Sequence, residues 1–138
     1  MELEHSGKLY LVSTPIGNLK DMYNAATVVF VGGSLVPKGG QNPIEGARFS
    51  KPIIFGPYMS NFQEIAQMFL NADAALMVKD EDELFEVFDT LLKNERERVI
   101  LGRNAGRIVS ENSGTIDKTV EELTILMSKM GEQASTGG

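Results

Sequence analysis

Four short runs of β-branched and aromatic residues, separated by segments that suit helices, most constrain how this chain can fold. The runs lie at residues 8–13, 27–31, 52–56 and 74–78. The second run, Thr27-Val-Val-Phe-Val, shows no alternation with polar residues, which is typical of a strand buried on both faces. Strands that alternate with helices favour an α/β domain with a parallel sheet, and right-handed crossovers are expected to place helices on both faces.

The segments outside these runs carry helical signals. The expected helices span 18–26, 42–50, 60–71, about 80–93, 95–112 and 116–130. A chain of 138 residues suits one domain. We therefore expect a single α/β domain at 8–130, a loose N-terminal segment at 1–7 and a flexible tail at 131–138.

Composition excludes several classes of function. The chain has no cysteine and one histidine, His5, which excludes a disulfide scaffold, a thiolate site and a cysteine nucleophile. A histidine metal cage is equally excluded, so we expect no bound metal and no cofactor. The formal net charge of −6 argues against a nucleic-acid partner. The start of the chain lacks an apolar signal core, which predicts a cytoplasmic protein.

No catalytic residue stands out, because no carboxylate has a partner at a diagnostic spacing. Candidate binding groups are easier to find, since ligands of parallel sheets bind at the carboxyl ends of the strands. Three loops follow such ends, at 14–18, 32–42 and 56–61. The loop at 32–42 holds two glycine pairs and leads into the expected helix at 42–50, whose first N–H groups could face an anion. That arrangement suits a phosphate or a nucleotide sugar, and it equally suits an ordinary glycine-rich connection.

Individual residues of these loops also have two interpretations each. Glu45 could accept hydrogen bonds from ribose hydroxyls, or it could form a capping box with Asn42. Lys38 could neutralise a phosphate or be a solvated loop lysine. The turn at 16–18 could present backbone N–H groups to a ligand or be a tight turn with an asparagine cap. The candidate binding residues are Ile16, Gly17, Asn18, Gly32, Gly33, Ser34, Lys38, Gly40, Asn42, Pro43, Ile44 and Glu45.

Two stretches of the chain match a known family pattern. Residues 27–45 read TVVFVGGSLVPKGGQNPIE, similar to FVGGSLV-x-x-GG-[HQ]-NP-[LI]-EPA, and residues 51–62 read KPIIFGPYMSNF, similar to KP-x-x-x-GP-[HY]-x-x-NF. Both patterns are those of the 3-deoxy-D-manno-octulosonic acid (Kdo) transferases, and the resemblance extends from about residue 16 to 130. It implies a Rossmann-like parallel sheet flanked by helices, the C-terminal half of a GT-B glycosyltransferase fold.

The resemblance also implies a reaction. Kdo transferases move Kdo from CMP-Kdo to a lipid A precursor in lipopolysaccharide biosynthesis, at the cytoplasmic face of the inner membrane and without a bound metal. In this picture the segments 16–18 and 42–45 contact CMP, with Glu45 at the ribose. This chain would be the donor-binding domain, with CMP or CMP-Kdo as its ligand.

Three departures from the family pattern change what we expect. Gly46 stands where the family has proline, which would loosen the first helical turn by at most about 1 kcal/mol. Asn18 replaces a carboxylate. The sequence has no match to the family's N-terminal domain. In the family, that domain is the partner that carries the acceptor site and the catalytic glutamate. We therefore expect little or no transferase activity from the chain alone; an inactive fragment that forms homo-oligomers through its exposed interdomain surface is the alternative.

A shorter resemblance points elsewhere. Residues 7–21, GKLYLVSTPIGNLKD, are similar to the start of the ribosomal RNA ribose methyltransferase I family, which uses S-adenosylmethionine. The match covers about 15 residues, and the rest of that family's pattern does not follow. A methyltransferase fragment is therefore the most remote of the three interpretations.

Overall fold

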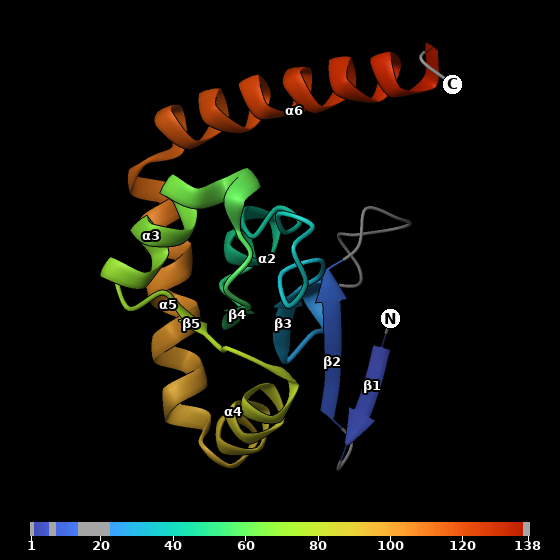
Figure 1. The fold of residues 1–138 in the computed structure, drawn as a ribbon. Helices are drawn as coiled ribbons and strands as arrows, with labels where there is room; N and C mark the ends of the chain where they lie inside the picture. The colour runs from blue at the N-terminus through green and yellow to red at the C-terminus, as the bar shows by residue number, and fades with distance from the viewer. Residues whose placement is uncertain (1, 6–7, 14–22, 137–138) are drawn as a thin grey trace.

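The computed structural model describes residues 2–5, 8–13 and 23–136, which form one five-stranded sheet with helices on both sides (Figure 1). The strand order follows the chain: β1 (Glu2–His5), β2 (Lys8–Ser13), β3 (Val28–Val31), β4 (Ile53–Phe55) and β5 (Ala75–Met77). β2 to β5 are parallel, and β1 pairs antiparallel with β2. The four predicted strands and their parallel arrangement are confirmed, whereas the segment 1–7, expected to be loose, contributes a fifth strand.

The helices also follow the predicted order. They are α2 (Ile44–Arg48), the 3-10 helix η1 (Ser60–Phe62), α3 (Gln63–Asn71), α4 (Glu81–Lys93), α5 (Glu95–Glu111) and α6 (Ser113–Thr136). Residues 23–25 are helical as predicted, and the rest of the expected helix at 18–26 lies outside the described residues. α2 is shorter than the predicted 42–50. α6 continues to Thr136, so a helix occupies most of the segment expected to be a tail.

Alternation along the central strands divides the core into two layers. Val29 and Val31 of β3 pack with residues of α2, α3 and α5 on one face of the sheet. Val28 and Phe30 of the same strand pack with α4 and the start of α5 on the other face. Because β3 and β4 are covered on both sides, their residues are all buried. This confirms the continuous apolar pattern of the sequence as that of a doubly covered sheet.

Side-chain caps set the start of the helices on the second face. Asp80 Oδ1 accepts a hydrogen bond from the Glu83 N–H at 2.9 Å, and Asn94 Oδ1 accepts one from the Glu97 N–H at 3.0 Å. These bonds satisfy N–H groups that have no partner within the first helical turn. In the part of the chain that the structure describes, no helix combines the length and apolar character needed to cross a bilayer.

Candidate functional site

Two of the three expected loops meet at the carboxyl edge of the sheet. The loop at 32–42 leaves β3 and the loop at 56–61 leaves β4, and backbone bonds such as Tyr58 N–H to Ser34 O (2.9 Å) join them. β2, which precedes the third loop in the chain, ends beside β3, because Ser13 and Val31, the last residues of the two strands, are register partners. Its candidate residues, Ile16, Gly17 and Asn18, lie outside the described part of the chain.

The glycine-rich loop has a defined, closed conformation. Its neck is joined by hydrogen bonds from Gly40 N–H to Gly33 O (3.0 Å) and from Gln41 N–H to Gly32 O (2.9 Å). Gly33 and Gly40 have φ values of 70° and 78°, in the left-handed region that side chains disfavour. The glycines therefore allow the chain to turn sharply at both ends of the loop, which makes it an ordered element of the edge.

Ser34 holds two loops together from inside the fold. Its side chain is fully buried, and its Oγ donates to Val31 O at 2.6 Å. The same oxygen accepts a hydrogen bond from the Gly56 N–H at 2.8 Å. Both functions of the hydroxyl are thus used within the protein, so Ser34 shapes the edge and does not present its hydroxyl to a ligand.

The segment after the glycine-rich loop forms a different cap from the one considered. Asn42 Oδ1 accepts from the Ile44 N–H at 2.9 Å, two residues along the chain, and the Asn42–Glu45 capping box does not form. Pro43 and Ile44 are buried, and the Ile44 N–H is already used by Asn42, so the structure does not present these two residues to a ligand. α2 has five residues, too few for a substantial helix dipole, so the expected anion-binding helix start is weaker than the sequence implied.

Glu45 and Lys38 remain accessible. The Glu45 side chain is 42% exposed, and one carboxylate oxygen lies 3.9 Å from Arg48 Nε. Arg48 itself contacts Asp117 of α6 at 2.6 Å. Lys38 is exposed at the far end of the glycine-rich loop. The loop and the start of α2 thus offer one carboxylate and one ammonium group on the same edge of the sheet.

Packing against the sheet explains why position 46 is a glycine, which the comparison with the family pattern did not suggest. Gly46 is buried, and a Cβ atom on it would lie 2.8 Å from Ile53 Cδ1 and 3.2 Å from Val29 Cγ1. The absence of a side chain therefore lets α2 approach β3 and β4 closely. We expected Gly46 only to loosen the first helical turn, and its close contact with the sheet was not predicted.

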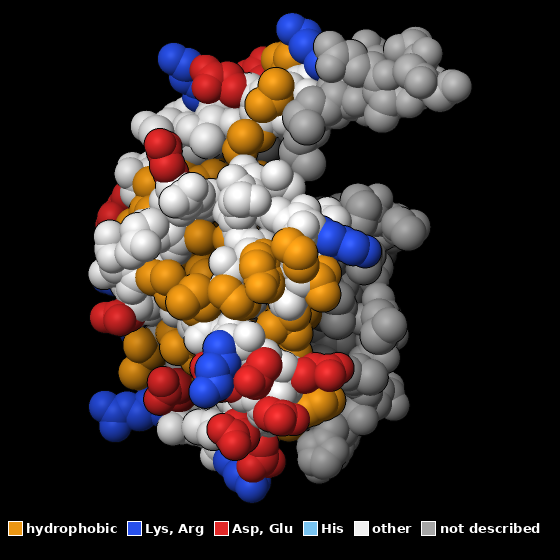
Figure 2. Space-filling view, in the orientation of Figure 1, with side chains coloured by type: hydrophobic (Ala, Val, Ile, Leu, Met, Phe, Trp, Pro, Cys, Tyr) orange, Lys and Arg blue, Asp and Glu red, His pale blue; other side chains and the backbone are white. Residues whose placement is uncertain are grey.

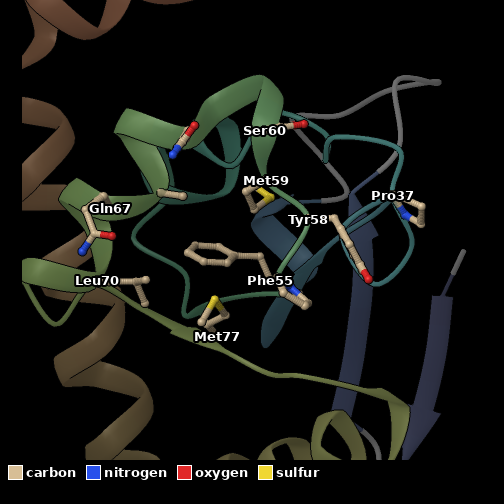
Figure 3. Close-up of a pocket in the computed structure, with 12 residues that line it drawn as sticks. Pro37, Phe55, Tyr58, Met59, Ser60, Gln67, Leu70 and Met77 are labelled. Carbon is tan, nitrogen blue, oxygen red and sulfur yellow. The ribbon is translucent and has the colours of Figure 1, made fainter.

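A cavity of about 370 Å³ opens beside the glycine-rich loop, at the ends of β4 and β5 (Figure 3). It is lined by Pro37, Phe55, Gly56, Pro57, Tyr58, Met59, Ser60, Gln63, Ala66, Gln67, Leu70 and Met77. The lining has no charged side chain, and its polar groups come from serine, tyrosine and glutamine. Of this lining, the sequence had indicated Pro37 in the loop at 32–42 and the residues of the loop at 56–61. Within the described residues, no three His, Asp or Glu side chains converge in a way that could hold a metal.

Known proteins resemble this chain in both sequence and structure, although no family profile matches it. A 3-deoxy-D-manno-octulosonic acid transferase of Haemophilus influenzae is 32% identical over 88% of this chain and 29% of the relative. Those of Rickettsia bellii and Chlamydia trachomatis serovar D are 35% and 32% identical over 84% and 82% of this chain, and 28% and 26% of the relatives. The chain thus spans less than a third of the length of these curated relatives.

A solved structure gives the same result for the fold. The C-terminal CMP-Kdo binding domain of WaaA from Acinetobacter baumannii is 30% identical, with a TM-score of 0.65 over 68% of this chain and 49% of that one. The fold and its glycine-rich edge define a Rossmann-like domain of the kind that forms the C-terminal half of GT-B glycosyltransferases. Within that class, the chain resembles the C-terminal part of the 3-deoxy-D-manno-octulosonic acid transferases.

Proposed function

We propose that this chain is the donor-binding part of a Kdo transferase and that it binds CMP-Kdo through the CMP group. The observation that carries the proposal is the likeness, at 30% identity and a TM-score of 0.65, to a domain described as binding CMP-Kdo. The patterns around the glycine-rich loop and the start of α2 are those most similar to the family.

The geometry of the edge supports a specific arrangement. The exposed Glu45 carboxylate can accept hydrogen bonds from the ribose hydroxyls, and Lys38 can neutralise the phosphate. Gly33 and Gly40 let the loop backbone approach the ligand closely. The segment 16–18, which the family pattern also assigns to CMP, belongs to the same proposal and lies outside the described residues. These groups form the proposed CMP site.

Transfer of Kdo belongs to a longer protein in this proposal. The chain spans under a third of its relatives, and a two-domain site needs both walls to exclude water and to position the acceptor. We therefore propose that an N-terminal GT-B domain is the partner, that lipid A precursor is the acceptor, and that the complete enzyme works at the cytoplasmic face of the inner membrane. Purified alone, this chain should transfer little or no Kdo.

An NMR titration with CMP tests the donor site directly. Amide shifts should move at 32–45, and Glu45→Ala should weaken binding by roughly 1.5–3 kcal/mol, the value of a hydrogen bond to a charged group. Because Glu45→Ala also frees Arg48, the matched control is Asp117→Ala, which removes the other acidic partner of Arg48. No shift at millimolar CMP, or equal weakening in both variants, would reject the site.

The alternative function, self-association without donor binding, has one observation in its favour. Tyr58 and Met77 line the cavity and are 43% and 51% exposed, and Val36, which precedes the lining residue Pro37, is 46% exposed. Figure 2 shows apolar side chains grouped on this face. Exposed apolar patches often mark interfaces. Sedimentation equilibrium would reveal a dimer, and Met77→Ser should dissociate it; a monomer at all concentrations would exclude this function.

A further inference from the structure

We propose that Asn61, the middle residue of η1, is a positioning residue that fixes the shape of the glycine-rich loop for donor binding. Asn61 is the last residue of the loop at 56–61 and is not among the groups expected to contact CMP. It would act through the loop and not on the ligand. The inference rests on the proposed function and names one residue on which the CMP site depends.

Two hydrogen bonds connect Asn61 to consecutive glycines of the loop. Its backbone N–H donates to Gly39 O at 3.0 Å, and its side-chain Nδ2 donates to Gly40 O at 3.4 Å. One residue therefore donates to two successive carbonyl groups of the loop. This arrangement fixes the orientation of the two peptide planes that link Gly39 to Gln41.

Steric contact adds to the hydrogen bonds. A Cβ atom at Gly39 would lie 2.5 to 2.7 Å from the amide atoms of Asn61. The side chain of Asn61 thus occupies the space that any side chain at position 39 would need. Gly39 also has a φ of 88°, so the chain at this point combines a left-handed turn with a close approach. The loop fits against Asn61 only because residue 39 is glycine.

The position of this contact explains its effect on the site. Gly39 and Gly40 lie directly between Lys38 and Asn42, and Gly40 N–H also closes the neck of the loop by donating to Gly33 O. Loss of the Asn61 contacts would leave the neck bonds and the contact of Gly40 with Met59 to restrain this part of the loop. A loop that must be ordered during binding lowers affinity, because the ordering entropy is then lost on binding.

Two variants and one control test the role of Asn61. Asn61→Ala removes the side-chain donor, and Asn61→Asp keeps the size but places a carboxylate against Gly40 O. The control is Asn71→Ala, which removes an exposed asparagine at the end of α3 that accepts a hydrogen bond from Gln67. Each protein is measured by amide hydrogen exchange without ligand, by CMP titration and by thermal unfolding.

We expect exchange of the Gly40 and Gln41 amides to quicken about tenfold or more in both variants. The affinity for CMP should fall about three- to tenfold in Asn61→Ala, the range of one neutral hydrogen bond, and further in Asn61→Asp. The exchange of β3 amides and the unfolding midpoint should change little. Asn71→Ala should match the wild type in every measurement.

The two readouts separate the possible failures. Unchanged exchange at Gly40 and Gln41 would overturn the role of Asn61, whether or not CMP binds. Faster exchange with unchanged CMP affinity would overturn it as a positioning residue of the donor site. If the wild-type protein does not bind CMP, the proposed function is wrong, and so is the link between Asn61 and donor binding. The exchange data would still show whether Asn61 orders the loop. If Asn61→Ala does not fold, the isosteric Asn61→Asp decides.

Discussion

Gly102 of α5 lies against the backbone carbonyl of Ser50, so closely that a Cβ atom at position 102 would overlap that oxygen. Ser50 follows α2 and has a left-handed φ of 55°. One helical turn further along α5, a Cβ at Gly106 would meet the Ser50 side chain. This contact brings α5 against the segment that connects α2 to β4, and so fixes the back of the candidate site.

Gly102→Ala should therefore destabilise the protein. The added methyl group must push α5 away from a backbone atom that cannot rotate aside, and overpacking of this kind costs about 1–3 kcal/mol, more than the gain in helix propensity. Urea unfolding measures the loss. The control is Gly114→Ala in α6, where a Cβ would meet nothing within 4 Å. That variant should be neutral or more stable by up to about 1 kcal/mol; equal losses in the two variants would contradict the packing argument.

Ser34→Ala should cost about 1–3 kcal/mol, because it leaves the buried Gly56 N–H and Val31 O without their shared partner. The loss should appear in the denaturant midpoint, and the amide of Gly56 should exchange faster. A variant within about 0.5 kcal/mol of wild type would show that water replaces the hydroxyl at this position.

The start of α4 depends on a single carboxylate. Asp80→Ala removes the cap on the Glu83 N–H and should cost about 1 kcal/mol of unfolding free energy. Asp82→Ala is the matched control, since it removes an equal charge from the same exposed turn without touching the cap. If the two variants lose the same stability, the helix dipole and not the cap is responsible.

The ion pair between Arg48 and Asp117 links α2 to α6 and should contribute little. Both side chains are about half exposed, at 41% and 58%, in spite of the 2.6 Å contact. A double-mutant cycle with Arg48→Ala and Asp117→Ala should give a coupling energy of about 0.2–1 kcal/mol that decreases with added salt. A coupling well above 1 kcal/mol would mean that α6 is fixed to the domain mainly through this pair.

The sequence predicted the parallel strands because their residues carry the signal themselves. Val28 to Val31 are apolar at every position, and the structure buries all four. The strand at 2–5, Glu-Leu-Glu-His, gave no such signal. It pairs with β2 through its backbone, and the residue types of a segment do not predict backbone pairing of this kind. α2 ends earlier than predicted because Ser50, which follows it, has a left-handed φ. The residue type does not indicate this conformation, since serine rarely adopts it.

The candidate site was predicted to a similar degree. Its glycine pairs identified the loop at 32–42, and three of these glycines have the left-handed φ values that glycine suits, but the sequence did not show that the loop is ordered. The cavity beside it could not be predicted, because Pro37, Tyr58, Gln67 and Met77 come from four separate segments and meet only in the fold (Figure 3). The hydrogen bond between the Ser34 hydroxyl and the Gly56 N–H could not be predicted from the sequence either, since the two residues are 22 positions apart.

The sheet ends in two short outer strands, and this affects how the protein behaves at high concentration. β1 has four residues, two of them glutamate, and β5 has three. Short or charged outer strands are poor templates for pairing with another chain, because few backbone groups are available and like charges repel. β2, which has six residues and would pair more readily, is already paired on both sides. Fibril-like stacking through open sheet edges is therefore disfavoured in the concentrated samples that a titration requires.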